Sequence, residues 1–349
     1  EVVVRLADLT LPILLASATP AGAAPDEART EDRSTVRADG TVPLSADLED
    51  YPYPFPVQDF TFQARGQTLH MAYMDVRPKG EPKGTVVLLH GKNFCGAYWE
   101  RTANLLVGRG YRVIIPDQVG FGRSSKPVDL QYSFHALAAW TDALLADRHA
   151  EDVIVVGHSM GGMVATRLVL DHPDRASKLV LVNPIGLEDW RRLTPYRDID
   201  TWTRRNLATT PDGVRQYMRN AYFDGQWKDA YEPLVALQAG WAVGPDREHL
   251  ARVSALHYDM IYSQPVVHEL PDVSVPTLLI IGERDRTALN KDLVDPDQRE
   301  KLGRYDILGK QAADAIPGAR LVALPGIGHL PQVEAWKRYE KALVGFVEE

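Results

Sequence analysis

The chain has 349 residues, of which 45% are hydrophobic, and its formal net charge is −8. Such a composition is ordinary for a globular protein with a large core. The acidic balance argues against a nucleic-acid partner, which needs a basic face. The single cysteine, Cys95, excludes an intramolecular disulfide, leaves no Cys/His metal spacing and is expected to be buried and unreactive.

The first residues have the order of a secretory signal peptide. Arg5 precedes a short apolar run from Leu9 to Ala16, and small residues ending in Ala21-Gly22-Ala23 follow. We therefore expect residues 1–24 to be a signal peptide and the protein to be periplasmic or secreted. The alternatives are an arm packed on the domain and a cytoplasmic protein. The apolar run is too short to span a membrane, and residues 25–56 are expected to form a loosely held N-terminal arm.

From residue 57 onward the pattern alternates between strands and helices. An antiparallel pair is expected at 60–63 and 68–76, turning at Gly66. Further strands are expected at 85–89, 112–115, 153–156 and 178–182, and helices at 98–107, 133–148 and 160–170. The apolar strands are continuous runs, which is typical of strands buried on both faces of a sheet. The pattern predicts an α/β fold in which helices cover a mostly parallel central sheet.

This alternation stops at residue 185. Residues 185–269 contain no clear buried strand but are rich in Trp, Tyr and Phe, so we expect a helical cap inserted into the core. Strands resume at 277–281 and 320–324, and a last helix is expected from Pro331 to Val347.

The core is accordingly predicted to comprise residues 57–184 and 270–349. Within its second part, the segment 286–305 is unusually long and polar for a connection after a strand. It is interpreted either as a flap near the site or as a surface excursion.

The motif Gly157-His158-Ser159-Met160-Gly161 stands between a predicted buried strand and a predicted helix. In this context G-x-S-x-G predicts a nucleophile elbow, because the sharp turn admits only small residues two positions either side of the serine. The turn also places the hydroxyl at a helix N-terminus, where negative charge is favoured. Ser159 is therefore the predicted nucleophile, and the alternative is a Gly-rich turn with a passive serine.

A serine nucleophile needs a base, and the base needs an acid to orient it. His329 follows the last predicted strand and precedes the final helix, so it is the predicted base. Asp285 directly follows the preceding predicted strand and is the predicted acid; the order Ser, acid, His along the chain fits this motif. Glu283, and Glu188 or Asp189, are alternative acids.

Acyl transfer also needs hydrogen-bond donors for the oxyanion. We expect one from the backbone N–H of Met160 and the other from that of Lys92, with Asn93 as the alternative. His90 and His158 lie close to these positions in the sequence. We expect both histidines to have structural roles.

Five landmarks resemble those of the α/β-hydrolase superfamily, in order: His90-Gly91, the loop from Asp117 to Pro127, the Ser159 elbow, Asp285 and His329. The resemblance extends from Val57 to Val347 and implies an α/β-hydrolase fold. It is greatest to the branch with epoxide hydrolases, haloalkane dehalogenases, C–C bond hydrolases and small esterases. The first two use an aspartate nucleophile, so Ser159 disfavours their activities. Stretches at 90–95 and 183–190 are similar to exported bacterial hydrolases.

The expected activity is hydrolysis of a small-molecule carboxylic ester through an acyl-enzyme on Ser159, without a metal or organic cofactor. The aromatic cap favours an apolar acyl or alcohol group, unless its aromatic residues only pack the cap onto the core. A second hypothesis is hydrolysis of a C–C bond, lactone or amide by the same residues. A third is a non-catalytic ligand receptor on a hydrolase scaffold.

Overall fold

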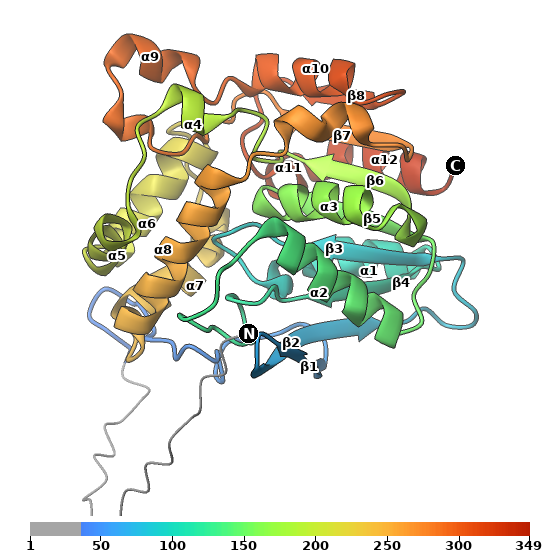
Figure 1. Ribbon diagram of the computed structural model, residues 1–349, viewed down its shortest axis with the longest axis horizontal. Coiled ribbons are helices and arrows are strands. Elements are labelled where there is room, and N and C mark those ends of the chain that lie inside the picture. Colours follow the sequence, from blue (N-terminus) through green and yellow to red (C-terminus); the bar gives the residue numbers. More distant parts are fainter. Residues whose placement is uncertain (1–35) are drawn as a thin grey trace, which may run out of the picture. The chain divides into compact units, whose positions relative to one another are not determined.

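The computed structural model describes residues 36–349, so the predicted signal peptide lies outside the described residues. Eight strands form one sheet in the order β1-β2-β4-β3-β5-β6-β7-β8 (Figure 1). The strands are β1 Val57–Ala64, β2 Gln67–Val76, β3 Thr85–Leu89, β4 Arg112–Pro116, β5 Val153–His158, β6 Ala176–Val182, β7 Thr277–Gly282 and β8 Arg320–Leu324. Only the β1–β2 and β2–β4 pairs are antiparallel. The prediction of a mostly parallel sheet is confirmed.

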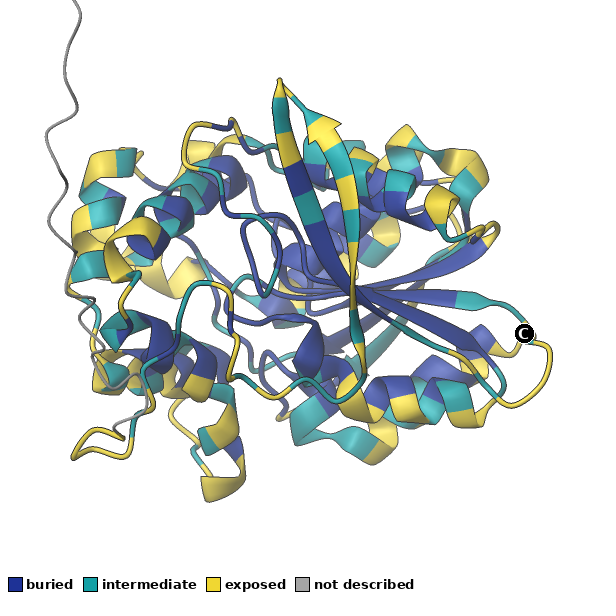
Figure 2. Cartoon of the chain, turned by 90° about the horizontal axis from the view of Figure 1, so that it is seen from below, coloured by how far each residue is buried: buried dark blue, intermediate teal, exposed yellow. Residues whose placement is uncertain are grey.

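The β1–β2 hairpin forms one edge of this sheet. Its turn residues Arg65 and Gly66 both have positive φ, 48° and 78°, and Ala64 pairs with Gln67. A two-residue turn with two positive φ values matches the right-handed twist of the flanking strands. Figure 2 shows exposed positions along this hairpin, whereas the central strands are buried. The expected turn at Gly66 is therefore confirmed.

Helices cover both faces of the sheet. The bounds of these helices are α1 Glu100–Gly108, α2 Phe134–Asp147, α3 Met160–Asp171, α10 Tyr305–Ala315, α11 Pro331–Glu334 and α12 Trp336–Val347, with short turns η1 Gly96–Trp99 and η2 Pro173–Arg175. Helices α1 and α12 pack against one face, and α2, α3 and α10 pack against the other (Figure 1). The apolar strands are thus buried from both sides, as their continuous runs require.

The cap is helical, as predicted. It comprises α4 Trp190–Leu193, α5 Ile199–Leu207, α6 Pro211–Tyr217, the π-helical turn η3 Met218–Tyr222, η4 Asp229–Leu234, α7 Ala236–Val243, α8 Arg247–Ser263 and η5 Val267–Asp272. No helix between residues 36 and 349 is both long enough and apolar enough to cross a membrane.

The C-terminal part differs from the expectation of a single last helix. The predicted last helix is two helices, because Ala335 leaves helical geometry with φ −130° and ψ 45°. Because of this break, Val333 of α11 packs against the apolar cluster around Tyr222 and Phe223 of the cap, while α12 packs against the sheet. The segment 286–305 also contains η6 Lys291–Leu293 and α9 Pro296–Lys301, and the sequence analysis did not foresee α10, which follows directly.

The described part of the N-terminal arm, residues 36–56, is held more tightly than expected around Leu44 and Leu48. Leu44 and Leu48 are buried in a cluster with Trp241 and Cys95, and Leu44 N donates to the carbonyl of Gly240 at 3.1 Å. The apolar side chains at these two positions are enough to bury this part of the arm between the cap and the core. Cys95 is buried, as expected.

Candidate active site

Ser159 lies in the turn between β5 and α3 and has a strained backbone, with φ 56° and ψ −121°. The turn is tight on both sides. A Cβ atom at Gly157 would lie 2.3 Å from the Gly161 carbonyl oxygen, and one at Gly161 would lie 2.2 Å from the Leu89 carbonyl oxygen. Both positions therefore require glycine, as the elbow motif predicts, and the Ser159 side chain is held at the N-terminus of α3.

Asp285 and His329 meet at the carboxyl ends of β7 and β8. The Asp285 Oδ2 and His329 Nδ1 atoms are 2.5 Å apart, and both side chains are fully buried. Asp285 also accepts hydrogen bonds from Asn183 Nδ2 at 3.0 Å and from the Thr287 N–H at 2.8 Å. These donors fix the carboxylate, which in turn fixes the imidazole. His329 Nε2 is buried and has no hydrogen-bond partner within residues 36–349, so this nitrogen is free to accept a proton.

The cap holds the His329 loop through Tyr222, which the sequence analysis missed. The His329 N–H donates to the Tyr222 carbonyl at 2.8 Å, and the two rings stack with centroids 4.5 Å apart. Tyr222 Oη accepts a hydrogen bond from Asn93 Nδ2 at 2.7 Å. A Cβ at Gly328 would lie 1.9 Å from the Tyr222 carbonyl oxygen, so glycine is needed there. The π-helical turn η3 produces this close approach, and such turns often occur at functional sites.

An ion pair joins the loops that carry the predicted acid and base. The guanidinium of Arg284 pairs with the carboxylate of Glu334, and both side chains are largely buried. Arg284 also donates to the Gly326 carbonyl at 3.0 Å, and Glu334 accepts from the Gly328 N–H at 2.7 Å. This network fixes the spacing between the two loops.

The alternative acids bond elsewhere. Glu188 accepts hydrogen bonds from the Gly303 N–H and from the Trp190 indole, and burial raises the pKa of its carboxyl group. Asp189 pairs with the guanidinium of Arg191, which is the main reason that its pKa is lowered. No hydrogen bond within the described part of the chain joins Glu188, Asp189 or Glu283 to His329, whereas Asp285 forms one.

His90 and His158 are both buried and both brace the site. His90 Nε2 accepts a hydrogen bond from the Gln118 N–H at 3.0 Å. His158 Nε2 lies 2.9 Å from the His329 carbonyl oxygen and its Nδ1 lies 2.9 Å from Tyr98 Oη. Burial lowers the pKa of both imidazoles. These contacts fit the structural roles expected for both histidines. The contact between His158 and the His329 carbonyl connects the elbow to the loop that carries His329.

The loop after β3 lies against the elbow. A Cβ at Gly91 would come within 3.0 Å of the Ser159 Cβ, so the next residue, Lys92, is close to the serine. Met160 is the first residue of α3, directly after the elbow. The two backbone N–H groups predicted to bind the oxyanion therefore belong to segments that both adjoin Ser159.

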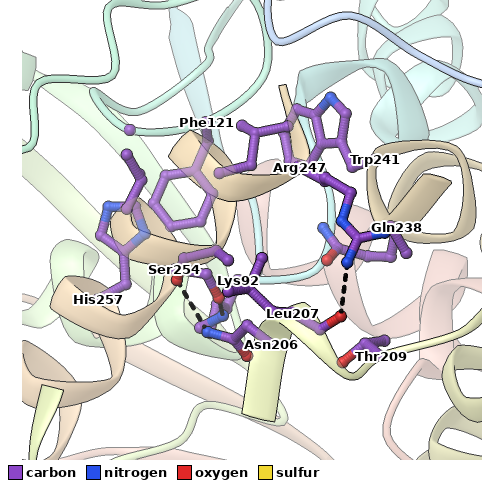
Figure 3. A pocket seen from close by; sticks show the side chains of 15 residues that line it. Lys92, Phe121, Asn206, Leu207, Thr209, Gln238, Trp241, Arg247, Ser254 and His257 are labelled. Carbon is purple, nitrogen blue, oxygen red and sulfur yellow. Dashed lines mark hydrogen bonds between the residues drawn. The ribbon is translucent and has the colours of Figure 1, made fainter. Parts of the chain in front are cut away.

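The side chain of Lys92 extends into the cap, as Figure 3 shows. Its Nζ donates to Ser254 Oγ at 2.8 Å and lies 3.7 Å from the centroid of the Tyr258 ring. Burial lowers the pKa of this amine to about 7. From the sequence, only the backbone N–H of Lys92 was expected to have a role in the site.

Replacing Lys92 by methionine is expected to raise the melting temperature, and to raise it more at pH 6 than at pH 9.5. Because the amine has a pKa of about 7 in the folded chain and 10.5 as its ordinary value, the unfolded chain binds more protons between these two values. The stability lost by burying the charge is therefore greatest below pH 7 and declines as the pH rises through that window. Calorimetry at both pH values measures the difference.

The matched control for this measurement is Lys310→Met, which removes an exposed lysine from α10. It should change the melting temperature by the same small amount at both pH values. An equal effect of Lys92→Met at pH 6 and pH 9.5 would contradict the lowered pKa.

A cavity of about 750 Å³ lies beneath the cap. The first part of the segment 286–305 forms one of its walls, from Arg286 to Asp292, which agrees with the flap interpretation. Some cap aromatics line this cavity, such as Trp202, while others, such as Phe223, are packed in the interior. No three His, Cys, Asp or Glu side chains of residues 36–349 gather as a metal site would require.

Comparisons with known proteins agree with this architecture. A family model described as the alpha/beta hydrolase fold matches residues 84–335. The crystal structure of a probable hydrolytic enzyme from Pseudomonas aeruginosa is 49% identical, with a TM-score of 0.86, and the match covers 88% of this chain and 99% of that chain. A haloalkane dehalogenase from Mycolicibacterium paratuberculosis is 32% identical over 68% of this chain and 79% of its own length. A human monoglyceride lipase is 27% identical over 69% of this chain and 78% of its own length.

Proposed function

This chain belongs to the α/β-hydrolase fold family, and on that premise we propose that it is a serine hydrolase that cleaves a small-molecule carboxylic ester. Its similarity to a dehalogenase and a lipase supports hydrolase activity in general. The observation that carries the finer proposal is the buried pair of Asp285 and His329. Asp285 occupies Nδ1 of the imidazole, and Nε2 remains without a hydrogen-bond partner in the described chain.

In the proposed acylation step, the Ser159 oxygen attacks the carbonyl carbon of the ester while His329 Nε2 takes the hydroxyl proton. Asp285 stabilises the resulting imidazolium and holds its orientation. The N–H groups of Met160 and Lys92 donate to the oxyanion of the tetrahedral intermediate. When the C–O bond breaks, His329 returns the proton to the leaving alcohol, and the acyl group remains on Ser159.

Deacylation repeats these steps with water. His329 removes a proton from a water molecule, whose oxygen attacks the acyl carbon. The second tetrahedral intermediate expels the Ser159 oxygen, which regains the proton from His329. The products are a carboxylic acid and free enzyme, so the same histidine acts as base and then acid in both halves of the reaction.

The serine at position 159 disfavours haloalkane chemistry despite the similarity to a dehalogenase, because that branch uses an aspartate nucleophile. Hydrolysis of a C–C bond, a lactone or an amide would use the same residues as ester hydrolysis. We favour an ester over an amide or a C–C bond because an alkoxide is expelled more easily than an amide anion or a carbanion. A lactone also expels an alkoxide, so only the substrate panel distinguishes it from an open-chain ester.

A panel of substrates tests this proposal. The purified protein should release 4-nitrophenolate from 4-nitrophenyl esters of acetate, butyrate and octanoate, and the activity should be lost in a Ser159→Ala preparation purified in parallel, which controls for contaminating esterases. If the protein hydrolysed lactones or anilides but not these esters, the bond that it cleaves would be a lactone or an amide instead. Absence of turnover throughout the panel would contradict the enzymatic proposal.

A further inference from the structure

Basic side chains dominate the cavity beneath the cap. The cavity lies between helices α5, α6 and α8 and the segment 286–292, and it reaches the loop after β3 at Lys92 and Asn93. Its charged lining consists of five basic side chains and one acidic side chain: Lys92, Arg197, Arg205, Arg286, Lys291 and Asp292. The chain as a whole has 47 acidic residues against 39 Lys and Arg. The excess of positive charge is therefore a local property of the cavity.

Aromatic rings hold two of these cations in place. Lys92 Nζ lies 3.7 Å from the centroid of Tyr258, which stacks on Trp202 with centroids 3.9 Å apart. The guanidinium of Arg197 lies 4.6 Å from the centroid of Trp202. An aromatic face attracts a cation without neutralising it. The stack therefore fixes both groups: the guanidinium of Arg197 stays charged for a ligand, whereas the amine of Lys92, whose pKa burial lowers to about 7, is mainly charged below that pH.

The positive charges are only partly neutralised within the cavity. Asp292 is shared by Arg197, at 2.7 Å, and Arg205, at 3.3 Å. Arg286 and Lys291 donate to backbone carbonyls. The Arg197 side chain is only 4% exposed, and its Nη1 has no hydrogen-bond partner among residues 36–349. The two guanidinium charges of Arg197 and Arg205 therefore exceed the single negative charge of the Asp292 carboxylate that they share.

We propose that this cavity binds a negatively charged oxygen group of the substrate, so that the natural substrate is an ester that carries a carboxylate in addition to the scissile bond. The inference rests on the proposed ester hydrolysis and specifies its substrate class. Lys92 and Asn93 line the cavity, and Lys92 follows Gly91, where a Cβ atom would lie 3.0 Å from the Ser159 Cβ. We therefore place the scissile bond of an anchored substrate beyond this loop, toward Ser159. The aromatic lining accommodates the carbon skeleton between the two groups.

Two matched substrate pairs test the inference. The first pair is mono-4-nitrophenyl glutarate, whose carboxylate lies on the acyl side of the scissile bond, and its neutral analogue methyl 4-nitrophenyl glutarate. The second pair is the 4-acetoxybenzoate anion, whose carboxylate lies on the leaving-group side of the scissile bond, and its neutral methyl ester. In at least one pair, kcat/KM for the anionic ester should exceed that for its neutral partner at least about tenfold. No preference for the anion in either pair would overturn the inference.

Removing a cavity cation should abolish this preference. Arg197→Gln and Arg205→Gln should each lower kcat/KM for the preferred anionic ester about tenfold, because a charge-assisted hydrogen bond is lost, and should change the neutral ester less than about twofold. Arg205 is half exposed, so its replacement should not impair folding. Arg252→Gln is the matched control, since Arg252 pairs with Asp200 outside the cavity. An unchanged preference in both cavity variants would contradict the assignment.

A binding measurement separates the cavity from the chemistry. Glutarate should bind the Ser159→Ala variant in calorimetric titration, and Arg197→Gln in that background should weaken binding about tenfold. Inorganic phosphate, titrated in parallel, should bind more weakly; tighter binding of phosphate would replace the carboxylate by a phosphate ester. Glutarate binding by a protein that hydrolyses no ester would reject the proposed function alone, and ester hydrolysis without glutarate binding would reject the anion site alone.

Discussion

Replacing Ser159 by alanine is expected to reduce kcat for ester hydrolysis by about a million-fold, to the level that substrate binding and the oxyanion donors alone support. The variant removes the only protein atom that bonds to the acyl carbon in the proposed mechanism. Alanine retains the Cβ atom of serine, so the elbow with φ 56° experiences no new steric conflict. Release of 4-nitrophenolate measures kcat, and the melting temperature verifies that the fold is intact.

The matched control is Ser177→Ala at the start of β6, where the hydroxyl donates only to the Asp152 carbonyl. This variant should retain kcat within about twofold. If Ser159→Ala kept more than about one hundredth of the wild-type kcat, the nucleophile would have to be another group.

Replacing Asp285 by asparagine is expected to lower kcat about ten-thousandfold, which is the effect of the equivalent change in the serine–histidine–aspartate mechanism. The amide has nearly the same shape as the carboxylate and its oxygen can still accept from the Thr287 N–H, but an amino group in the place of Oδ2 loses the hydrogen bond from Asn183. It cannot stabilise the imidazolium of His329, and its amino group favours the wrong tautomer of the ring. The measurement is kcat for a 4-nitrophenyl ester across pH 5 to 9.

Glu283→Gln and Glu188→Gln provide the controls for Asp285. Neither carboxylate contacts His329 in the described chain, so both variants should retain kcat within about threefold. Glu188→Gln should lower the melting temperature instead, because Glu188 accepts hydrogen bonds from Gly303 and Trp190. A loss of kcat in Glu283→Gln as large as that in Asp285→Asn would identify Glu283 as the acid instead of Asp285.

The fold was predictable where local sequence carried a strong signal. Residues 86–89 of β3 and 153–156 of β5 are all apolar because both faces of the central strands are buried, and the positions of the strands followed directly from this pattern. The break at Ala335 left no such signal, because neither proline nor glycine occurs there and apolar residues continue on both sides. The buried arm around Leu48 was missed because its composition is polar and its burial depends on distant cap residues.

The candidate site divides in the same way. The placement of Ser159, Asp285 and His329 at one edge of the sheet was predictable because each lies at or shortly after the end of a strand, and parallel strands bring their carboxyl ends together. Tyr222 and Asn183 contact these residues from segments far away in the sequence, and nothing in their own surroundings indicates it. The Lys92 side chain points toward the cap because its amine binds Ser254 of α8, a contact between distant segments. The charged cavity that it lines could therefore be found only in the structure.

The most direct test of the central claim is to locate the nucleophile chemically. The protein is incubated with a fluorophosphonate, which forms a stable adduct with an activated serine, and the modified peptide is sequenced by tandem mass spectrometry. We expect a single adduct on Ser159, formed fully in the wild type and in Ser177→Ala, and formed much more slowly in Asp285→Asn. Absence of an adduct under conditions in which the protein hydrolyses an ester, or an adduct on a different residue, would contradict the account.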